Sequence, residues 1–351
     1  MLLEKTIAGI EKLDAGVMEK ARRHQKNLVK PAGSLGMLEE VAVRIAGITG
    51  AIKPVLEKKT VIVCAGDHGV AARKVSAADQ EVTGQMVRGF LDGGAAINVL
   101  AGHVGAEVIC VDLGMIRPLD DPRLRVHRLG PGTADIAAGP AMSRAQARAA
   151  VETGIEIAAG EIEKGVKLLA TGDMGIGNTT PSTAILAAFT GFPVVLITGQ
   201  GTGIGPEAMQ RKTQIVEQAL RVNKPDPRDG LAVLAGVGGF EIGAIAGVIL
   251  GAAALRVPVV IDGLISGAGA MIARALAPAA LDFVLASHLS EEPGHRVMLN
   301  WLGVRPMLQM NMRLGEGTGA ALSLPLIDAA LKIAREMATY DQAGVSDKGL
   351  R

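Results

Sequence analysis

The chain has 351 residues, a formal net charge of +1 and only 2% aromatic side chains. A charge so close to zero argues against nucleic acid or an anionic membrane as the main partner, and the scarcity of aromatic rings argues against a base-stacking surface. The length predicts one large or two moderate domains. The two cysteines, Cys64 and Cys110, lie inside apolar runs without metal-binding spacing, so we expect buried thiols in a cytoplasmic protein.

The first part of the chain has a helical pattern. Residues 1–29 place apolar side chains on one stripe and predict an amphipathic helix. The segment KPAGSLGMLEE at 30–40 indicates a turn that leads into a second helix at about 37–50. Charged residues occur too early in the chain for a secretory signal.

The middle of the chain contains six short apolar runs, each of which ends in a loop of small or polar residues. The runs are 60–64, 107–111, 166–170, 193–197, 258–261 and 282–286. Runs that are apolar on both faces are typical of a parallel sheet covered by helices on both sides. Helical patterns lie between them at 143–164, 207–222 and 231–255, and Ser143 and Gln146 form a capping box at the start of the first. The sequence therefore predicts an α/β doubly wound, Rossmann-like fold with a mostly parallel six-stranded sheet.

The segment 231–255 is apolar and long enough to raise the alternative of a membrane-spanning helix. Glu241 interrupts it, glycine is frequent in it, and no basic flank sets an orientation. We therefore expect a helix buried against the sheet and no association with a membrane. After about residue 304 the strand pattern stops, a glycine loop and an amphipathic helix are predicted at 312–338, and the tail from Tyr340 is expected to be mobile.

The stretch LLATGDMGIGNTTPSTAIL at 168–186 combines the end of a strand, a glycine loop and the start of a helix. Thr180 is placed to cap that helix, and Pro181 falls in its first turn, where a missing N–H costs nothing. Backbone N–H groups that glycine exposes, together with the helix dipole, can bind an oxyanion. An ordinary strand-to-helix turn that needs glycine for its dihedral angles explains the loop equally well. Because ligands of such sheets bind beyond the carboxyl ends of the strands, we expect the loops after the six runs to form one site.

A second glycine loop, GQGTGIG at 199–205, follows an apolar run and precedes a helix. Its spacing is not that of a dinucleotide fingerprint and it lacks a Walker lysine, so it predicts a general phosphate or ribose loop. Lys212 on the following helix could reach a phosphate as a point charge. A solvated helix face is the alternative for Lys212, and spacing alone favours that alternative because Arg211 lies beside it.

The remaining titratable residues give weaker signals. His68 follows Asp67 at a strand end and could be a base, a ligand or a loop residue, and no second His or Cys has the spacing of a metal site. No GxSxG sequence indicates a serine hydrolase. Glu316 lies between Gly315 and Gly317, which would let a bulky ligand approach its carboxylate. A helix-start acid favoured by the helix dipole is the alternative, and the residue taken alone favours it.

The chain contains, in this order, motifs that resemble those of the nicotinate-nucleotide–dimethylbenzimidazole phosphoribosyltransferase family: AGDHGV, VSAADQEVTGQM, TGDMGIGNTT, GFEIGAIAG, DGLISGAGA, ASHLSEEPGH and MRLGEGTGAAL. The resemblance runs from about residue 28 to 338. It implies transfer of the phosphoribosyl group of nicotinate mononucleotide to 5,6-dimethylbenzimidazole, which yields α-ribazole 5'-phosphate and nicotinate for the nucleotide loop of cobalamin. It also implies a homodimer, a large α/β nucleotide-binding domain at 56–304, and a small helical domain made of 1–55 and 305–351. No metal and no cofactor is implied, because the pyridinium leaving group makes the glycosidic bond labile.

The resemblance assigns roles to individual residues. Glu316 in GEGTGA corresponds to the glutamate that accepts the proton of the attacking base, and Ser76 and Gln85 match the segment that lines the benzimidazole pocket. Asp173 stands where relatives often have Glu, and its shorter side chain favours a role in holding the loop or the ribose over direct catalysis. The substrate-binding set that the resemblance implies is Ser76, Gln85, Asp173, Gly175, Gly177, Asn178, Gly201, Thr202, Gly203, Lys212, Asp262, Ser290 and Leu314.

Two alternatives from other classes remain. A nucleotide-binding scaffold protein would bind the nucleotide without releasing nicotinate. An NAD-linked oxidoreductase would change the absorbance of its cofactor, whereas phosphoribosyl transfer would not.

Overall fold

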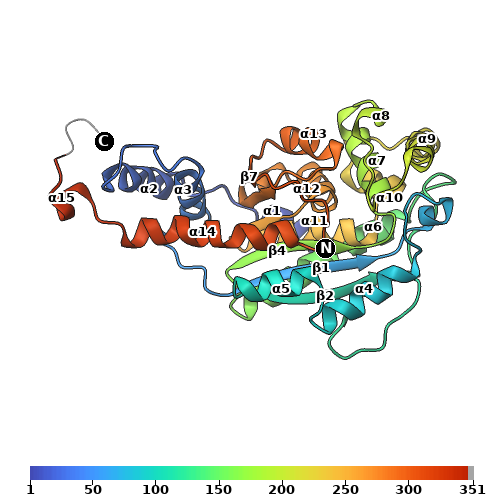
Figure 1. The fold of residues 1–351 in the computed structure, drawn as a ribbon, viewed down its shortest axis with the longest axis horizontal. Helices are drawn as coiled ribbons and strands as arrows, with labels where there is room; N and C mark the ends of the chain where they lie inside the picture. The colour runs from blue at the N-terminus through green and yellow to red at the C-terminus, as the bar shows by residue number, and fades with distance from the viewer. Residues whose placement is uncertain (347–351) are drawn as a thin grey trace.

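In the computed structural model, which describes residues 1–346, seven parallel strands form one sheet at the centre of the molecule (Figure 1). Their order is β3-β2-β1-β4-β5-β6-β7, so the order reverses between β1 and β4. The predicted doubly wound α/β fold is confirmed, with one strand more than expected. The strands are β1 (Lys59–Gly66), β2 (Glu107–Gly114), β3 (Arg125–Val126), β4 (Leu168–Met174), β5 (Val259–Ile261), β6 (Val284–His288) and β7 (Pro306–Leu308).

Five of the six predicted strands belong to this sheet, and the run at 193–197 does not. Val194–Ile197 forms the short helix α8 instead. Periodicity could not decide between strand and helix here, because an apolar run of five residues fits both. The sequence does not predict β3 and β7, which are the two short edge strands. β7 also corrects the expectation that strands stop after residue 304.

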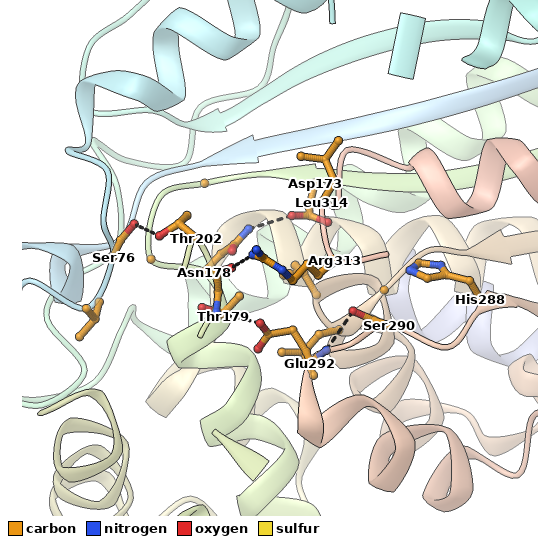
Figure 2. Close-up of a pocket in the computed structure, with 18 residues that line it drawn as sticks. Ser76, Asp173, Asn178, Thr179, Thr202, His288, Ser290, Glu292, Arg313 and Leu314 are labelled. Atoms are coloured by element: carbon orange, nitrogen blue, oxygen red, sulfur yellow. Dashed lines mark hydrogen bonds between the residues drawn. The ribbon is translucent and has the colours of Figure 1, made fainter. Parts of the chain in front are cut away.

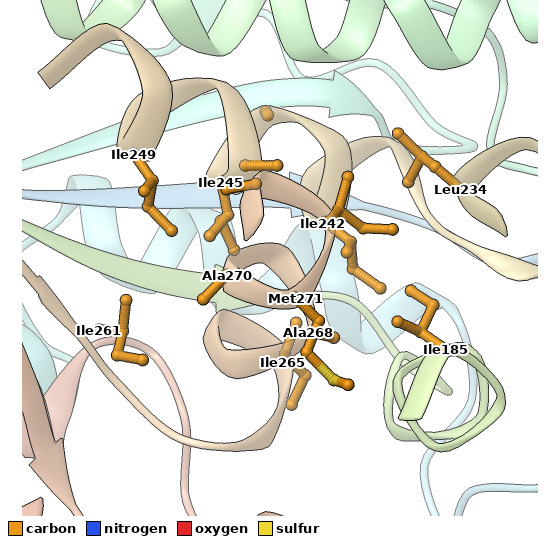
Figure 3. Packing of buried hydrophobic residues seen from close by; sticks show 14 of the residues in the cluster. Ile185, Leu234, Ile242, Ile245, Ile249, Ile261, Ile265, Ala268, Ala270 and Met271 are labelled. Atoms are coloured by element: carbon orange, nitrogen blue, oxygen red, sulfur yellow. The ribbon is translucent and has the colours of Figure 1, made fainter. Parts of the chain in front are cut away.

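Helices lie on both faces of the sheet (Figure 1). Along β1, Ile62 and Cys64 face one hydrophobic core, and Val61, Val63 and Ala65 face the other, because successive side chains of a strand point to opposite faces. The other helices are α1 (Leu2–Ala8), α2 (Ala15–Asn27), α3 (Met37–Thr49), α4 (Glu81–Leu91), α5 (Ala96–His103), α6 (Arg144–Glu163), α7 (Thr179–Thr190), α9 (Pro206–Asn223), α10 (Gly230–Val237), α11 (Phe240–Ala254), α12 (Leu264–Leu276), α13 (Pro293–Leu302), α14 (Thr318–Glu336) and α15 (Tyr340–Ala343), with 3-10 turns at Gly69–Arg73 and Pro278–Phe283. The first core contains α6, α7, α10, α11 and α12 (Figure 3), and the second contains α3, α4, α5 and α14.

The apolar segment 231–255 forms two buried helices rather than one, because the chain leaves the helical conformation at Gly238 and Gly239. A Cβ on Gly239 would lie 2.6 Å from both Glu241 Oε2 and His68 Cε1, so glycine is needed there. His68 Nε2 lies 2.8 Å from Glu241 Oε1, and this partner makes the burial of a charged residue in α11 tolerable. Within residues 1–346, every helix is too short or too polar to cross a membrane.

Helices α6 and α11 contact each other backbone to backbone. A Cβ on Gly154 would overlap the carbonyl oxygen of Ala244, and a Cβ on Gly247 would overlap that of Val151. α11 also contacts β1, β2 and β4, so it lies between α6 and the sheet. Gly154 and Gly247 therefore allow α6 to pack closely on the outer side of α11.

The N-terminal segment 1–29, predicted to be helical, contains the two helices α1 and α2. The side chain of Asp14 accepts the backbone N–H of Val17 at 2.9 Å and begins α2 as its N-cap. The predicted helices at 37–50, 143–164 and 207–222 are present as α3, α6 and α9, and the capping box that begins α6 is formed. The glycine loop and helix predicted at 312–338 are present, with α14 as the helix.

Segments from the two ends of the chain lie side by side, at the left of Figure 1. The N–H of Val29 donates to the carbonyl oxygen of Ala338 at 2.9 Å. The hydroxyl of Tyr340 donates to the carbonyl oxygen of Lys30, also at 2.9 Å. Tyr340 is buried, so the expectation of a mobile tail beginning there is wrong, and residues 347–351 lie outside the described part of the chain. The division into domains at 56 and 304 stays a prediction.

The single tryptophan, Trp301 of α13, joins three helices. Its ring stacks on Phe189 of α7, with the ring centroids 5.4 Å apart and the planes at 30°. The guanidinium carbon of Arg274 on α12 lies 4.3 Å from the centroid of the indole, a cation–π contact. These contacts fix α13 against α7 and α12.

Candidate active site

Loops at the carboxyl ends of β1, β4, β5 and β6, together with the loop before α14, surround one cavity of about 530 Å³ (Figure 2). The reversal of strand order between β1 and β4 is where doubly wound sheets bind their ligands. The lining residues are Val75, Ser76, Asp173, Gly175, Gly177, Asn178, Thr179, Gly201, Thr202, Gly263, Leu264, Ile265, His288, Ser290, Glu292, Arg313, Leu314 and Gly315.

The structure separates the predicted site residues into two groups. Those that line the cavity are Ser76, Asp173, Gly175, Gly177, Asn178, Gly201, Thr202, Ser290 and Leu314. Those that do not line it are Gln85, Gly203, Lys212, Asp262 and Glu316. Gln85 lines a second cavity of about 520 Å³, together with Asp67 and Arg88. Ser76 and Gln85 therefore do not share one cavity.

The first glycine loop joins β4 to α7 as the sequence predicts, but the helix begins earlier than expected. α7 starts at Thr179, with Asn178 in the position before it, and no side chain caps it. Thr180, expected as the cap, lies inside the first turn and is buried, because Gly177 with a φ of +92° turns the chain before it. The N–H groups of Asn178 and Thr180 donate to the carbonyl oxygens of Gly175 and Gly177, at 3.1 and 3.0 Å, and Pro181 has no N–H. The start of α7 therefore offers an anion mainly its helix dipole.

Asp173 lies at the end of β4 and is buried beside this loop. Asn178 Nδ2 donates to Asp173 Oδ2 at 2.9 Å, and Asp173 Oδ1 has no hydrogen-bond partner within residues 1–346. Burial raises the pKa of Asp173 well above its usual value, the carboxylate of Asp262 raises the pKa further, and the hydrogen bond from Asn178 opposes both. Asp173 therefore keeps its proton to a higher pH than a solvated aspartate does.

The second glycine loop is tied to several other loops (Figure 2). Thr202 Oγ1 lies 3.0 Å from Ser76 Oγ. The N–H of Gly201 donates to Glu292 Oε1 at 2.8 Å, and Arg313 Nη1 donates to the carbonyl oxygen of Gly201 at 3.1 Å. Hydrogen bonds to the peptide groups of Gly201 and to the side chain of Thr202 therefore hold this loop at the cavity.

Lys212 lies behind this loop. Its side chain is fully buried, which contradicts the solvated helix face. Nζ donates to Thr179 Oγ1 at 2.7 Å and to the carbonyl oxygen of Gly199 at 2.9 Å. A Cβ on Gly201 would lie 3.3 Å from Nζ, so one glycine separates the ammonium group from the cavity. Burial lowers the pKa of Lys212 to about 8, and the carboxylate of Glu292 acts in the opposite direction.

Asp262 caps α14 from a different part of the chain. Its Oδ2 accepts the N–H of Gly317 at 3.2 Å, and its Oδ1 accepts the N–H of Ala320 at 3.0 Å. This carboxylate therefore fills the place of the helix-start acid, which was the alternative role for Glu316. Burial raises the pKa of Asp262, and the nearby imidazole of His288 opposes that effect.

Glu316 has an unusual backbone conformation. Its φ is +63°, between Gly315 and Gly317 with φ of +86° and +91°, and such strain in a residue other than glycine points to function. Glu316 Oε2 is buried and has no hydrogen-bond partner in the described chain. Burial raises the pKa of Glu316, hydrogen bonding from the backbone of Ile97 opposes this, and the carboxylate of Asp262 adds to the increase. Glu316 does not line the cavity itself, but the two residues before it do.

Sequence reasoning missed two charged lining residues, Glu292 and Arg313, whereas His288 lies in one of the loops expected to form the site. Arg313 lies just before GEGTGA, and this position is a signal that could have found it. No local pattern indicates Glu292, because its partner Gly201 is 91 residues away in the sequence. Across residues 1–346, the His, Cys, Asp and Glu side chains form no group of three or more that could hold a metal ion.

Known proteins match nearly the whole chain. A family model described as phosphoribosyltransferase matches residues 10–345. A protein of Chloroflexus aggregans named nicotinate-nucleotide–dimethylbenzimidazole phosphoribosyltransferase is 57% identical over 348 residues, which are 99% of each chain. The chain belongs to the nicotinate-nucleotide–dimethylbenzimidazole phosphoribosyltransferase family.

Other proteins with this family's name agree in sequence and in fold. The phosphoribosyltransferase of Geobacter sulfurreducens is 52% identical over 347 residues, 99% of each chain. The crystal structure of the phosphoribosyltransferase from Thermus thermophilus superposes with a TM-score of 0.90 at 46% identity, and the match covers 95% of this chain and 99% of that one. The resemblance found in the motifs is confirmed, and the protein is a phosphoribosyltransferase.

Proposed function

We propose that this phosphoribosyltransferase transfers the phosphoribosyl group of nicotinate mononucleotide to 5,6-dimethylbenzimidazole. The products would be α-ribazole 5'-phosphate and nicotinate, and the reaction would serve assembly of the nucleotide loop of cobalamin. The observation that carries the proposal is one cavity that combines two glycine loops, an uncapped helix start and the apolar side chain of Leu314. The first three suit a nucleotide phosphate, and Leu314 suits a flat apolar base. Relatives of the same length bear the name of this reaction.

The phosphate would bind at the loops 175–178 and 201–203. The dipole of α7 favours an anion there, whereas the N–H groups of Ile176, Asn178, Gly201 and Gly203 already donate to acceptors within the protein. Lys212 would supply a positive charge from behind Gly201, and Arg313 would supply a second charge from the cavity wall. Gly203 would serve the fold of the loop, since it does not line the cavity.

The transfer step requires a nucleophile and a proton acceptor. One ring nitrogen of the benzimidazole would attack C1 of the ribose, while the bond from C1 to nicotinate breaks and its electron pair goes to the pyridinium ring. Attack opposite the leaving group inverts the anomeric carbon and gives the α product. Glu316 would take the proton from the other ring nitrogen, and the raised pKa of its carboxyl suits a proton acceptor. Asp173 would hold the ribose or the loop.

The remaining site residues would bind substrate or support those that do. Ser76, Ser290 and Leu314 line the cavity and would contact substrate. Asp262 would fix the loop that carries Glu316. Gln85, the homodimer and the cytoplasmic location are proposed on the family resemblance alone, and gel filtration tests the homodimer.

The decisive experiment is incubation of the protein with nicotinate mononucleotide and 5,6-dimethylbenzimidazole, followed by chromatography. We expect equal amounts of nicotinate and α-ribazole 5'-phosphate. Nicotinate released without a ribazole product would indicate hydrolysis, and binding without release would indicate a scaffold protein. Absorbance changes with NAD and a reduced substrate would indicate an oxidoreductase. Each of these three outcomes would contradict the proposal.

A further inference from the structure

A buried carboxylate lies on the other side of the second glycine loop from Lys212. Glu292 precedes α13, is 6% exposed and lines the cavity. Its Oε1 accepts the N–H of Gly201 at 2.8 Å, whereas its Oε2 is buried without a hydrogen-bond partner in residues 1–346. A Cβ on Gly199 would overlap Oε2, and the carbonyl oxygen of this same glycine accepts a hydrogen bond from Lys212 Nζ. The loop 199–201 therefore lies between the two charges and is bonded to both.

Few other charged groups act on Lys212. The helices packed against α9, which are α7, α8 and α10, contain no charged residue. Arg211 beside it on α9 is exposed, and burial lowers the pKa of His295 on α13 to about 3, so this imidazole is neutral. Arg313 reaches the loop at the carbonyl oxygen of Gly201. The other titratable side chains that line the cavity are Asp173 and His288.

We propose that Glu292 is a positioning residue for the nucleotide phosphate: it holds Gly201 in place and supplies the negative charge that keeps the buried Lys212 protonated. The inference rests on the proposed function, because it takes Lys212 as the cation that the phosphate meets. An ammonium group has three donors, and Lys212 uses two of them on neutral oxygens. The third donor can serve the phosphate, and Glu292 sets the pH range in which that donor carries charge.

The physical basis is the balance between burial and charge. Burial brings the pKa of Lys212 down to about 8, and the Glu292 carboxylate resists this decrease. Without the carboxylate, Lys212 would lose its proton at a lower pH, and a neutral amine binds phosphate weakly. Glu292→Gln removes the charge but keeps an oxygen that can accept the N–H of Gly201. The same change removes the repulsion between carboxylate and phosphate, so binding in mildly acidic solution should be equal or tighter.

The test is calorimetric titration of nicotinate mononucleotide into the wild type and Glu292→Gln over a range of pH. We expect the ratio of the variant Kd to the wild-type Kd to rise from about 1 or below at about pH 6.5 to about 10 at about pH 8.5, since a nearby opposite charge commonly moves a pKa by about 1 or more. The titration of the phosphate itself, with a pKa of about 6, affects both proteins equally. Glu291→Gln is the matched control, because it removes an exposed carboxylate one residue away and should behave as wild type. Nicotinate riboside, which lacks the phosphate, should show no such dependence.

Three results would overturn the inference. A Kd ratio that stays constant with pH would mean that Glu292 only holds the loop. An equal pH effect on nicotinate riboside would separate Glu292 from the phosphate, and a pH effect that persists in a Lys212→Met background would separate it from Lys212. Circular dichroism establishes that each variant is folded. If the wild type instead fails to bind the nucleotide or to release nicotinate, the proposed function itself is wrong.

Discussion

The backbone of Glu316 is held in its left-handed conformation by contacts outside its own side chain. A Cβ on Gly172 of β4 would overlap the carbonyl oxygen of Glu316, so the loop lies directly on the strand. The next residue, Gly317, donates its N–H to Asp262. Because the backbone is fixed in this way, the conformation of the loop does not depend on the Glu316 carboxylate, whose Oε2 has no hydrogen-bond partner in the described chain.

Glu316→Gln is expected to lower kcat by about 10²- to 10⁴-fold, the usual contribution of a general base. The Kd for nicotinate mononucleotide should stay near the wild-type value, since the shape of the side chain is kept. Because burial raises the pKa of Glu316, wild-type kcat should fall as the pH decreases through that raised pKa, where the carboxylate becomes protonated. Steady-state kinetics across pH and calorimetric binding measure both effects. Turnover close to normal in the Gln variant at neutral pH would rule out the role.

The full burial of Lys212 decides which substitution tests it. Alanine would leave a hole in the structure, whereas Lys212→Met keeps the volume and removes the charge. A hydrogen bond to a charged group contributes about 1.5–3 kcal/mol, so the affinity for nicotinate mononucleotide should fall by about 10- to 100-fold. The affinity for 5,6-dimethylbenzimidazole should not change. Titration of each substrate separately measures this, and equal weakening of both would refute the phosphate role.

The stability expected for Lys212→Met follows from the direction in which burial shifts the pKa of Lys212. The folded pKa of Lys212, about 8, lies below that of a solvated lysine, so burial of the charge opposes folding below pH 8. This unfavourable contribution to folding decreases as the pH rises above about 8, because the folded protein then buries a neutral amine. Lys212→Met should therefore be at least as stable as the wild type at neutral pH, which thermal melting measures.

The sequence predicts these residues unequally. The glycine loops and Asp173 could be found because each lies at or just after the end of an apolar run, although the run before the second loop folds as the helix α8. The burial of Lys212 could not be found, since it depends on α7 and on a loop carbonyl 13 residues away. Glu292 gives no local signal at all, because only the folded chain brings it to Gly201.

Among the helices and strands, the central elements were predictable and the edges were not. β1, β2, β4, β5 and β6 are apolar on both faces, and a parallel sheet between two helical layers requires this. The edge strands β3 and β7 are too short to form an apolar run. The division between α10 and α11 falls at two glycines inside an apolar segment, where no polar residue marks an end. Hydrophobic pattern therefore finds buried elements but not where they stop.

The contact between α6 and α11 gives a prediction at this scale. Gly247→Ala should destabilise the protein by about 1–3 kcal/mol, because the new methyl group overlaps the carbonyl oxygen of Val151 in a packed core. Gly160→Ala, on α6, is the matched control, because a Cβ there meets nothing within 4 Å. Alanine in a helix is favoured over glycine, so Gly160→Ala should stabilise by about 0.5–1 kcal/mol. Urea unfolding measures both, and shifts of the same sign would contradict the argument.

At the scale of the whole molecule, α14 connects the cavity to the segments at the two ends of the chain. Its 19 residues begin just after Glu316 and end where Ala338 pairs with Val29. α1 does not join those segments, since the N–H of Leu3 donates to Glu152 on α6 at 3.1 Å. We propose that the small domain consists mainly of α2, α3 and the second half of α14.

Hydrogen exchange tests this proposal. If the small domain unfolds as a unit, amides in α2, α3 and the second half of α14 should share one opening free energy, below that of β1 and β4. Tyr340→Phe removes the hydrogen bond to Lys30 and should lower that opening free energy by about 1 kcal/mol. β1 and β4 should exchange as before. Equal acceleration in the sheet would mean that the chain has one cooperative unit and no small domain.

Trp301 is positioned to serve as an intrinsic fluorescence probe. Trp301 is the only indole in the chain, and the chain has one tyrosine, so ultraviolet emission reports on a single place. That place is the stack on Phe189, near the end of the same helix whose first residue, Thr179, lines the cavity. If nucleotide binding moves α7, the shielding of the indole by Phe189 and Arg274 would change with it. Stopped-flow fluorescence of the unlabelled protein would then follow occupancy of the site in real time.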